Sequence, residues 1–385
     1  MIFVKQKDHV HMHVEASDEG ITKEISDFFT FEVPGASFMP SYRNRHWDGK
    51  IRLYNYTKRE LYVGLLPYLL EFAKQLEYEV KLEMGEIGEE MSKEEVREFA
   101  TRLKLHSDRK PIQIRDYQED AVFDAVNGGR TLLLSPTASG KSLIIYNLAR
   151  YHHALGRKQL IVVPTTSLVE QMYGDFADYS THNGFNVSKY CHRIYGGKEK
   201  SNKADIVIST WQSIYKYPKK WFEEFDVVYG DEAHLFKAKS LMTLMDKCTN
   251  ARFRIGTTGT LDGTKTHRLV LEGVFGKVYK VTTTKKLMDK KELAELKIIC
   301  MLIEYTDEER KLVSKMPYKE EMDFLVGHAG RNDIISKLTI TQKGNTLLLY
   351  QFVEKHGHVL YDKITKMTAR PVHFVFGGTV IEQRK

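Results

Sequence analysis

The stretch Leu-Leu-Leu-Ser-Pro-Thr-Ala-Ser-Gly-Lys-Ser at residues 132–142 decides the fold, because it predicts a strand, a tight loop and the start of a helix. Backbone N–H groups in such a loop, with a helix N-terminus behind them, form an anion site suited to phosphates. Lys141 would reach the outer phosphates of a nucleotide, and the Ser142 hydroxyl would hold Mg²⁺. The strict pattern has glycine where this chain has Ser135, so the stretch alone also fits a plain strand-to-helix turn.

The sequence Asp-Glu-Ala-His at residues 231–234 removes this ambiguity. It follows the apolar run 225–229, and an acidic residue at the end of a strand is where nucleotide-bound Mg²⁺ needs a second protein contact. Asp231 is expected to hold the metal, and Glu232 to orient and deprotonate the attacking water. His234 completes the motif and is counted among the catalytic candidates. The two stretches together predict a site for ATP and Mg²⁺.

Short apolar runs that alternate with amphipathic segments predict an α/β fold. The runs are 131–134, 160–163, 205–209, 225–229 and 253–256. Buried strands separated by helices are typical of a parallel sheet with helices on both faces. One expected helix covers residues 116–126 and ends at the glycine pair 128–129, and another is capped at Ser92 with Glu95 three residues later.

Composition limits the classes of protein to which the chain can belong. It has 385 residues, three cysteines and a net charge of +7. Three widely spaced cysteines exclude a disulfide scaffold and favour a reducing compartment. No signal peptide or membrane span is predicted, so a cytoplasmic protein is expected. The mild positive charge permits a polyanionic partner without requiring one.

A basic and aromatic stretch at residues 41–60 is a candidate DNA contact. It carries six Lys or Arg residues against two acidic ones. Lys and Arg neutralise phosphates, so four of them are expected to contact DNA: Arg43, Arg45, Lys50 and Arg52. The aromatic residues Trp47, Tyr54 and Tyr56 are expected to belong to the core of a small domain instead. The segment 215–221, another basic and aromatic run, fits either a strand-separating wedge or a surface loop.

Six motifs in order resemble those of superfamily-two helicases and translocases. Residues 135–142 and 231–234 resemble motifs I and II, and 114–118 resembles the Gln motif that reads adenine. The resemblance implies that nucleotide is bound by Tyr117, Gln118, Thr137, Ala138, Ser139, Gly140, Lys141 and Ser142. It implies that nucleic acid is bound by Pro164, Thr165, Thr166, Gly196, Gly197, Thr210 and Gln212. Motif III, which couples the two sites in that superfamily, would be Thr258, Gly259 and Thr260.

A closer resemblance is to the UvsW helicases of T-even phages. That family shares the segments 163–168, 209–212 and 218–222, and its amino-terminal domain carries an F-x-P-x-x-R-x-x-x-W-D-G-x-I-R-L stretch, found here at 38–53. Two departures are Ala138-Ser139, where the family has Ser-Ala, and His234 in place of Cys. The resemblance implies an ATP-dependent DNA helicase of recombination and repair. Its substrates would be branched, single-stranded or double-stranded DNA, with RNA–DNA hybrids in R-loops, in the cytoplasm of a phage-infected host.

The chain divides by composition into three parts, at the polar connector 106–111 and the charged connector that begins at 285, and the resemblance indicates what each part would be. They would be a small α+β DNA-docking domain (1–108), a first RecA-like ATP-binding domain (109–284), and a linker with an incomplete second RecA-like domain (285–385). Strands are expected in the last part at 346–350 and 372–376, with a helix at 353–365 between them. Residues 348–353 resemble motif IV, and 376–379 resemble the segment after it.

Motif V and the Q-x-x-G-R-x-x-R motif VI, which in this superfamily supply the second side of the ATP site, do not occur in the sequence. We therefore expect residues 1–385 alone to bind Mg·ATP and DNA but to hydrolyse ATP and unwind DNA poorly. Two alternatives remain open at this point. One is the motor subunit of a restriction-nuclease complex, and the other is an ATP- and DNA-binding module without efficient hydrolysis.

Overall fold

The computed structural model describes residues 1–196, 203–237, 239–261 and 263–376. The chain forms two compact units, residues 1–295 and residues 296–385, and each is described by itself. Among the described residues, no helix has the length and apolar character needed to cross a membrane.

The amino-terminal segment, defined here as residues 1–108, is built on a five-stranded sheet with the order β5-β6-β2-β1-β7. Its strands are β1 (Ile2–Gln6), β2 (His11–Ala16), β5 (Tyr54–Asn55), β6 (Glu60–Tyr62) and β7 (Val80–Glu83). A separate hairpin is formed by β3 (Thr30–Glu32) and β4 (Lys50–Arg52). The helices are α1 (Glu19–Phe28), α2 (Pro40–Arg43), α3 (Leu66–Gln75) and α4 (Lys93–Arg102), with short 3₁₀ turns η1 (Ala36–Phe38) and η2 (Val63–Leu65). The expected capping box of Ser92 and Glu95 is present at the start of α4.

The motor segment, defined here as residues 109–295, contains a seven-stranded parallel sheet with the order β12-β13-β11-β14-β15-β10-β16. Its strands are β10 (Arg130–Leu134), β11 (Gln159–Val163), β12 (Cys191–Ile194), β13 (Ile206–Thr210), β14 (Val227–Asp231), β15 (Phe253–Thr258) and β16 (Val278–Lys280). Five of them match the apolar runs of the sequence, and the α/β fold class is confirmed. The two outermost strands, β12 and β16, were not predicted. A short hairpin of β8 (His106–Ser107) and β9 (Lys110–Pro111) leads into the segment.

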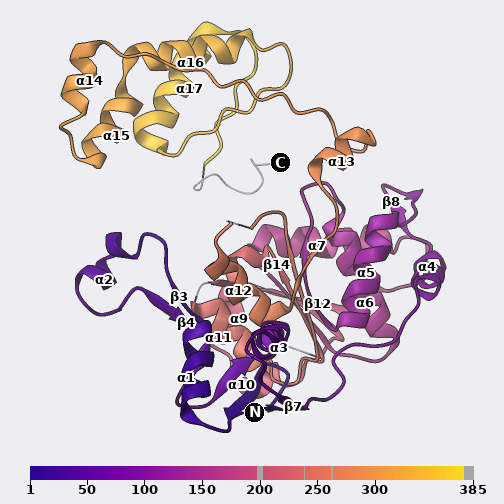
Figure 1. Ribbon diagram of the computed structural model, residues 1–385. Helices are drawn as coiled ribbons and strands as arrows, with labels where there is room; N and C mark the ends of the chain where they lie inside the picture. Colours follow the sequence, from indigo (N-terminus) through magenta and orange to yellow (C-terminus); the bar gives the residue numbers. More distant parts are fainter. Residues whose placement is uncertain (197–202, 238, 262, 377–385) are drawn as a thin grey trace. The chain divides into compact units, whose positions relative to one another are not determined.

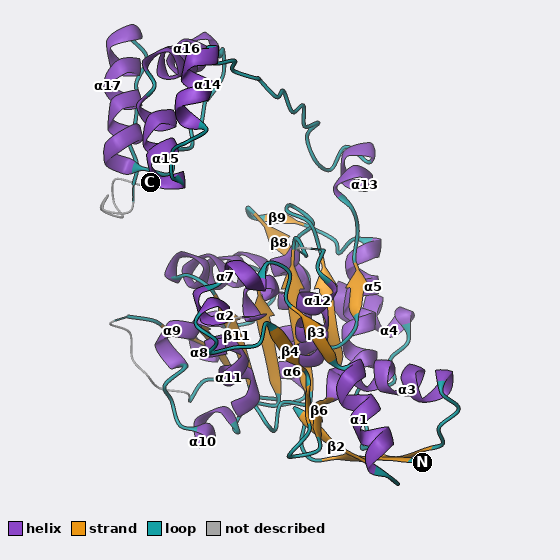
Figure 2. Ribbon diagram, turned by 60° about the vertical axis from the view of Figure 1, so that its left-hand side comes forward, coloured by secondary structure: helices purple, strands orange, loops and turns teal. Residues whose placement is uncertain are grey.

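Helices cover both faces of this sheet (Figures 1 and 2). Side chains alternate along each strand, so Leu133 packs under one helical layer and Leu132 under the other. The first layer consists of α5 (Asp116–Gly128), α6 (Lys141–Ala154), α7 (Thr166–Tyr179) and α8 (Val187–Tyr190). The second consists of α9 (Trp211–Ile214), α10 (Lys219–Phe222), η3 (Ala233–Lys237), α11 (Lys239–Lys247) and α12 (Lys265–Phe275). Helix α5 ends as expected, with Gly129 in the left-handed conformation at φ 63°.

In the described part of the unit of residues 296–385, all regular secondary structure is helical. Its helices are α14 (Asp307–Val313), α15 (Tyr318–Gly327), α16 (Ala329–Thr341), the π-helical turn η4 (Val353–Gly357) and α17 (His358–Met367). The predicted helix at 353–365 is therefore present, but the strands expected at 346–350 and 372–376 are not formed within residues 296–376. Two strands alone make a marginal sheet, because each needs a further neighbour to satisfy its backbone and cover its side chains.

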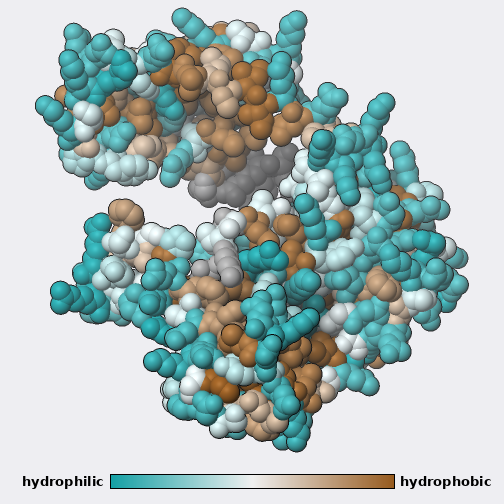
Figure 3. All heavy atoms as spheres, in the orientation of Figure 1, coloured by the Kyte–Doolittle hydropathy of each residue, from teal (hydrophilic) through white to brown (hydrophobic). Residues whose placement is uncertain are grey.

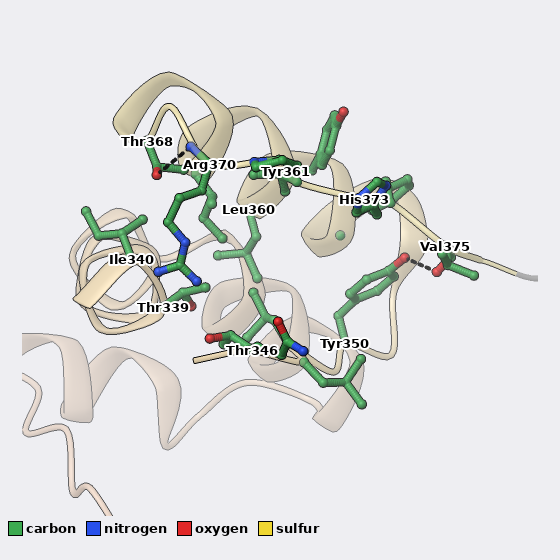
Figure 4. Close-up of a pocket in the computed structure, with 18 residues that line it drawn as sticks. Thr339, Ile340, Thr346, Tyr350, Leu360, Tyr361, Thr368, Arg370, His373 and Val375 are labelled. Atoms are coloured by element: carbon green, nitrogen blue, oxygen red, sulfur yellow. Dashed lines mark hydrogen bonds between the residues drawn. The ribbon is translucent and has the colours of Figure 1, made fainter. Parts of the chain in front are cut away.

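The two segments that were expected to be strands instead border a cavity of about 450 Å³ (Figure 4). Tyr350 stacks on Phe374, and its hydroxyl donates to the carbonyl of Val375 at 2.7 Å. The side chains of Leu347 and Leu349 are 84% and 80% exposed. Figure 3 shows hydrophobic residues gathered on the visible face of this unit. The apolar residues that suggested strands are thus largely uncovered.

Candidate nucleotide and nucleic-acid site

The phosphate loop, residues 135–142, joins the end of β10 to the start of α6. Ala138 (φ 65°) and Gly140 (φ 79°) adopt left-handed backbone conformations that bend the chain back toward the helix. The hydroxyl of Ser139 donates to the carbonyl of Pro136 at 2.6 Å and lies 2.6 Å from the hydroxyl of Ser135. Ser135, which stands where the strict pattern has glycine, therefore helps to hold the loop through its contact with Ser139. Thr137 and Ala138 are exposed at the turn of the loop.

Lys141 points from this loop toward the acidic residues at the end of β14. Its Nζ lies 3.7 Å from Oε1 of Glu232, and both side chains are partly exposed. Asp231 is buried, and its Oδ1 accepts a hydrogen bond from Oγ1 of Thr257 at 2.7 Å. Burial raises the pKa of Asp231, although the bond from Thr257 opposes the shift. The two motifs that the sequence placed about 90 residues apart meet at the carboxyl edge of the sheet.

His234 connects the acidic residues to the expected motif III. Its Nδ1 lies 3.0 Å from Oγ1 of Thr258 and 3.3 Å from Oε2 of Glu232. The Thr258 hydroxyl in turn donates to the carbonyl of Thr260 at 2.9 Å. A side chain at Gly259 would stand 3.6 Å from the Lys141 ammonium group. These contacts give the candidate coupling residues a direct link to the phosphate loop and to Glu232.

Gln118 and Tyr117 contact the phosphate loop from the start of α5. Gln118 is 2% exposed, its Nε2 donates to the carbonyl of Ser139 at 2.8 Å, and its Oε1 accepts from the Arg115 backbone at 2.9 Å. The Tyr117 hydroxyl donates to the same Ser139 carbonyl at 3.3 Å. Both ends of the Gln118 amide are thus hydrogen-bonded within the protein, and the Nε2 end holds the phosphate loop. Arg115 is half-exposed beside Tyr117 and is a further candidate to contact the base of the nucleotide. It belongs to the motif at residues 114–118 but was not among the residues predicted from the sequence.

Ser142 is held by two residues that the sequence did not indicate. Its hydroxyl lies 2.9 Å from the hydroxyl of Tyr179, and it also interacts with the Asp175 carboxylate, whose pKa is raised by burial. Both partners lie on α7, one helical turn apart. Hydroxyl and carboxylate oxygens such as those of Ser142 and Asp231 are ligands that suit Mg²⁺, so the residues present fit this metal with ATP. Among the described residues, no group of three or more His, Cys, Asp or Glu side chains gathers as a separate metal site.

The candidate nucleic-acid residues of the motor segment lie on neighbouring strands. Thr210 pairs in register with Val163, which directly precedes Pro164. Nε2 of Gln212 donates to the Pro164 carbonyl at 3.3 Å, so the ends of β11 and β13 are joined. Thr165 caps α7 through the backbone N–H of Leu168.

Thr166 is exposed, whereas Thr210 is buried and bonded to Ser213. A side chain at Gly196 would meet open space. Gly197 lies outside the described residues, as do residues 377–379 of the expected segment after motif IV.

The basic residues of the amino-terminal segment fall into two places. Arg43 and Arg45 lie at α2 and just after it, and both are exposed. Lys50 and Arg52 lie on β4, where Arg52 pairs with Asp48 at 2.5 Å and lowers the pKa of that carboxyl to about 2. Lys50 Nζ lies 3.9 Å from a carboxylate oxygen of Glu32. Among the described residues, neither Arg43 nor Arg45 forms an ion pair of the kind that occupies Lys50 and Arg52.

The aromatic residues near these charges behave differently from one another. Tyr54 is buried as expected, and its hydroxyl donates to the carbonyl of Val14 at 2.9 Å. The expectation for Tyr56 is wrong, because this ring is exposed and bonds Glu19 at the surface while Arg59 lies over it. Trp47 is half-buried, with its Nε1 donating to the Lys50 carbonyl at 2.9 Å.

The segment 215–221 is fixed on the body of the motor segment. Nζ of Lys247 donates to the carbonyls of Tyr215 and Tyr217 at 2.7 and 2.8 Å. The rings of Tyr217 and Trp221 pack edge to face at 5.1 Å between centroids, against the second helical layer. These contacts favour a surface loop over a projecting wedge.

The sequence is similar to known helicases and translocases over most of its length. The family model "DNA helicase UvsW, N-terminal" matches residues 1–83, and the model "Type III restriction enzyme, res subunit" matches residues 111–263. The ATP-dependent DNA helicase uvsW of Enterobacteria phage T4 is 35% identical over 387 aligned residues, which cover 98% of this chain and 75% of that protein. A DNA 3'-5' translocase, XPB2 of Sulfurisphaera tokodaii, is 25% identical over 56% of this chain and 45% of its own length.

Two solved structures of T4 UvsW agree with this relationship. One has a TM-score of 0.65 at 36% identity and is matched over 99% of its length by 72% of this chain. The other has a TM-score of 0.66 at 32% identity and is matched over 76% of its length by the whole chain. With the amino-terminal match, the RecA-like sheet and the alignment over 98% of this chain in agreement, the chain belongs to the UvsW family of helicases.

Proposed function

We propose that this protein is an ATP-dependent DNA helicase that acts on branched DNA. The observation that carries the proposal is the meeting of the phosphate loop and the acidic residues at one edge of the sheet, with Lys141 Nζ 3.7 Å from Glu232. A cation beside a carboxylate, at a helix N-terminus, is an arrangement that binds nucleotide phosphates and positions a water molecule. Membership of the UvsW family supports DNA as the second partner.

The residues of this edge would divide the work of ATP hydrolysis among them. Lys141 would neutralise the outer phosphates, while Ser142 and Asp231 would hold Mg²⁺, which stabilises the charge that develops on the transferred phosphoryl group. Glu232 would orient the attacking water and take its proton. His234, placed between Glu232 and Thr258, would link this chemistry to the candidate coupling residues Thr258–Thr260.

Nucleic acid would be bound at two places. The motor segment offers the backbone-contacting residues around Pro164–Thr166 and Thr210–Gln212, and the amino-terminal segment offers Arg43 and Arg45. We propose fork regression, Holliday-junction migration and unwinding of D- and R-loops as the reactions, with single-stranded DNA, double-stranded DNA and RNA–DNA hybrids as partners. Recombination and repair in the cytoplasm of an infected host would be the setting.

We further propose a division into a DNA-docking domain (1–108), a first RecA-like domain (109–284) and a linker with part of a second (285–385). Residues 1–385 by themselves would hydrolyse ATP slowly, because the sequence contains no Q-x-x-G-R-x-x-R pattern. Arginines of that kind accelerate phosphoryl transfer by about 10³–10⁵-fold.

A second candidate function, the motor subunit of a restriction-nuclease complex, is favoured by the family model that matches residues 111–263. It predicts DNA cleavage when a nuclease partner is present. The helicase proposal predicts strand displacement without cleavage.

The experiment that tests the proposed substrate compares a four-way DNA junction with a linear duplex of equal length. We expect the protein to bind the junction more tightly than the duplex. In an Arg43→Ala/Arg45→Ala variant, the slope of log affinity against log salt concentration should become shallower by about 0.9 for each phosphate contact that is lost. Lys23→Ala/Lys74→Ala removes the same charge from exposed helical positions of the same segment and serves as the control. Equal affinities for the two DNAs, with unchanged salt dependence in the arginine variant, would contradict the proposal.

A further inference from the structure

Helix α12 contributes buried residues to two hydrophobic cores. Leu271, Val274 and Phe275 are buried in the core under the second helical layer of the motor segment. Leu269 and Val270, on the same helix, are buried in the core of the amino-terminal segment. A helix shared in this way cannot move relative to one core without disturbing the other, because protein interiors are close-packed.

Glu272, in the carboxyl-terminal half of this helix, is a fully buried carboxylate for which the proposed ATP chemistry has no role. Its Oε2 accepts from the hydroxyl of Tyr68 at 2.5 Å. Its Oε1 accepts from Nε of Arg268 at 3.1 Å and from the backbone N–H of Val278 at 3.2 Å. A buried charge is stable only when it is paired and hydrogen-bonded. Glu272 therefore ties α3 of the amino-terminal segment to β16 of the motor sheet.

The backbones meet beside this carboxylate without room for a side chain. A Cβ at Gly64, in η2, would lie 2.0 Å from the carbonyl oxygen of Glu272 and 2.6 Å from that of Gly273. Such an approach is possible only for glycine. The amino-terminal segment is thus seated directly on the α12 backbone.

The carboxyl end of α12 reaches the strands that carry the candidate ATP residues. The ring of Phe275 packs on two glycines, where a Cβ would stand 2.6 Å away at Gly230 and 2.9 Å away at Gly256. Gly230 directly precedes Asp231, and Gly256 lies two residues before Thr258. One continuous path of packed groups therefore joins Tyr68 and Gly64 to the nucleotide edge.

We propose that α12 couples nucleotide binding in the motor segment to the amino-terminal segment, with Glu272 and Tyr68 as its positioning residues. This inference rests on the proposed nucleotide site. A shift of the Asp231 and Thr258 strand ends on nucleotide binding moves Phe275, and the shared helix carries that movement to η2 and α3. Coupling of this kind is reciprocal, so DNA held by the amino-terminal segment influences the affinity of the motor segment for nucleotide to the same extent.

The test is amide hydrogen exchange of the full 385-residue protein, with and without Mg²⁺ and a non-hydrolysable ATP analogue. Two peptides decide the result: residues 136–142, which report nucleotide binding, and residues 61–70, which contain η2 and the start of α3. In the unaltered protein we expect the analogue to slow exchange in both, by about fivefold in residues 61–70.

Two variants break the path at the same contact by different means. Tyr68→Phe removes the hydrogen bond to Glu272 and keeps the ring, and Gly64→Ala pushes η2 off the α12 backbone. In both we expect residues 136–142 still to respond and residues 61–70 to lose their response. Tyr78→Phe is the matched control, because its hydroxyl also donates to a glutamate, Glu24 at 2.7 Å, but at the exposed surface of the same segment.

The results separate this inference from the function on which it rests. A response in residues 136–142 with none in residues 61–70 of the unaltered protein would overturn the coupling alone. An undiminished response of residues 61–70 in both variants would also overturn it. If residues 136–142 do not respond at all, the proposed nucleotide site fails, and the coupling fails with it.

Discussion

Strand β10 of the motor sheet and the segment at 346–350 of the second unit have similar apolar sequences, yet only β10 is a strand. Leu132 and Leu133 of β10 are fully buried between neighbours on both sides, β15 and β16. Leu347 and Leu349 are mostly exposed, and Leu347 borders a cavity rather than another strand. The difference teaches that an apolar run becomes a strand only where partners complete its hydrogen bonds and cover its side chains.

The presence or absence of neighbouring strands also explains why the motor segment holds its candidate site residues in place and the second unit does not. Loops at the carboxyl edge of a parallel sheet are positioned by the ladder beneath them, as Lys141 and Glu232 are by β10 and β14. Residues 296–376 contain no ladder of this kind.

The largest effect concerns the second side of the ATP site, because the sequence contains no Q-x-x-G-R-x-x-R pattern. We expect residues 1–385 to hydrolyse ATP slowly on DNA. A fusion that supplies a complete second RecA-like domain carrying a Q-x-x-G-R-x-x-R segment after residue 385 should raise the rate by about 10³–10⁵-fold. Steady-state phosphate release measures this, with the same fusion carrying alanine in place of both arginines as the control. Rapid DNA-stimulated hydrolysis by the unaltered 385 residues would contradict the prediction.

The next effect lies within the formed edge of the motor sheet. Glu232→Gln keeps the shape of the side chain but removes its ability to accept a proton, so single-turnover hydrolysis should fall by about 10²–10⁴-fold. Nucleotide affinity should change little, because Lys141 and the phosphate loop remain. Glu224→Gln, which alters a surface partner of Lys158, is the control. A parallel loss of binding and hydrolysis would assign Glu232 to binding instead.

The third effect compares the two apolar runs directly. Leu133→Ala leaves a cavity in a filled core and should lower the free energy of unfolding by about 2–5 kcal/mol. Leu349→Ala removes an exposed side chain and should change it by no more than about 0.5 kcal/mol. Urea unfolding followed by circular dichroism gives both values. Losses of similar size would mean that Leu349 is covered in solution.

The smallest effect is a dependence of folding stability on pH, which has opposite signs at Glu309 of the second unit and at Asp231 of the motor segment. Bonds from His328 and Thr306 lower the pKa of Glu309 below its ordinary value, so its contribution to stability is present at neutral pH and is lost as the pH falls through that lowered pKa. Burial raises the pKa of Asp231, so acid favours the folded state of the motor segment at that residue.

Glu309→Gln should therefore flatten the loss of helical circular dichroism between about pH 5 and pH 3, slightly because the group is exposed. The neighbouring Glu308→Gln variant is the control. If both variants give the acid profile of the unaltered protein, the contact with His328 has no role in stability.

The sequence predicted the parts of the fold that depend on local patterns. The five central strands, helix α5 with its glycine end and the capping box of α4 follow from apolar runs and capping residues. The edge strands β12 and β16 were missed because they are short and carry charged residues, which interrupt the apolar run expected of a buried strand.

Contacts between distant residues could not be predicted from such patterns. Tyr179 reaches Ser142 from a helix 37 positions later, and no local signal marks a tyrosine for that contact. Gln118 was selected as a nucleotide residue, but the bond from its Nε2 to the phosphate loop depends on the packing of α5 against Ser139, while its Oε1 caps α5 itself. The double burial of α12 likewise depends on where the amino-terminal segment lies.

The central claim is that the phosphate loop and the acidic edge together form a nucleotide site, and equilibrium binding of a fluorescent ATP analogue with Mg²⁺ tests it most directly. Loss of a charged hydrogen-bond donor costs about 1.5–3 kcal/mol, so Lys141→Ala should bind about 10–100-fold more weakly than the unaltered protein. Lys158→Ala, which removes the same charge from a residue paired with Glu224 before β11, should bind as tightly as the unaltered protein. Unchanged affinity in Lys141→Ala would contradict the account.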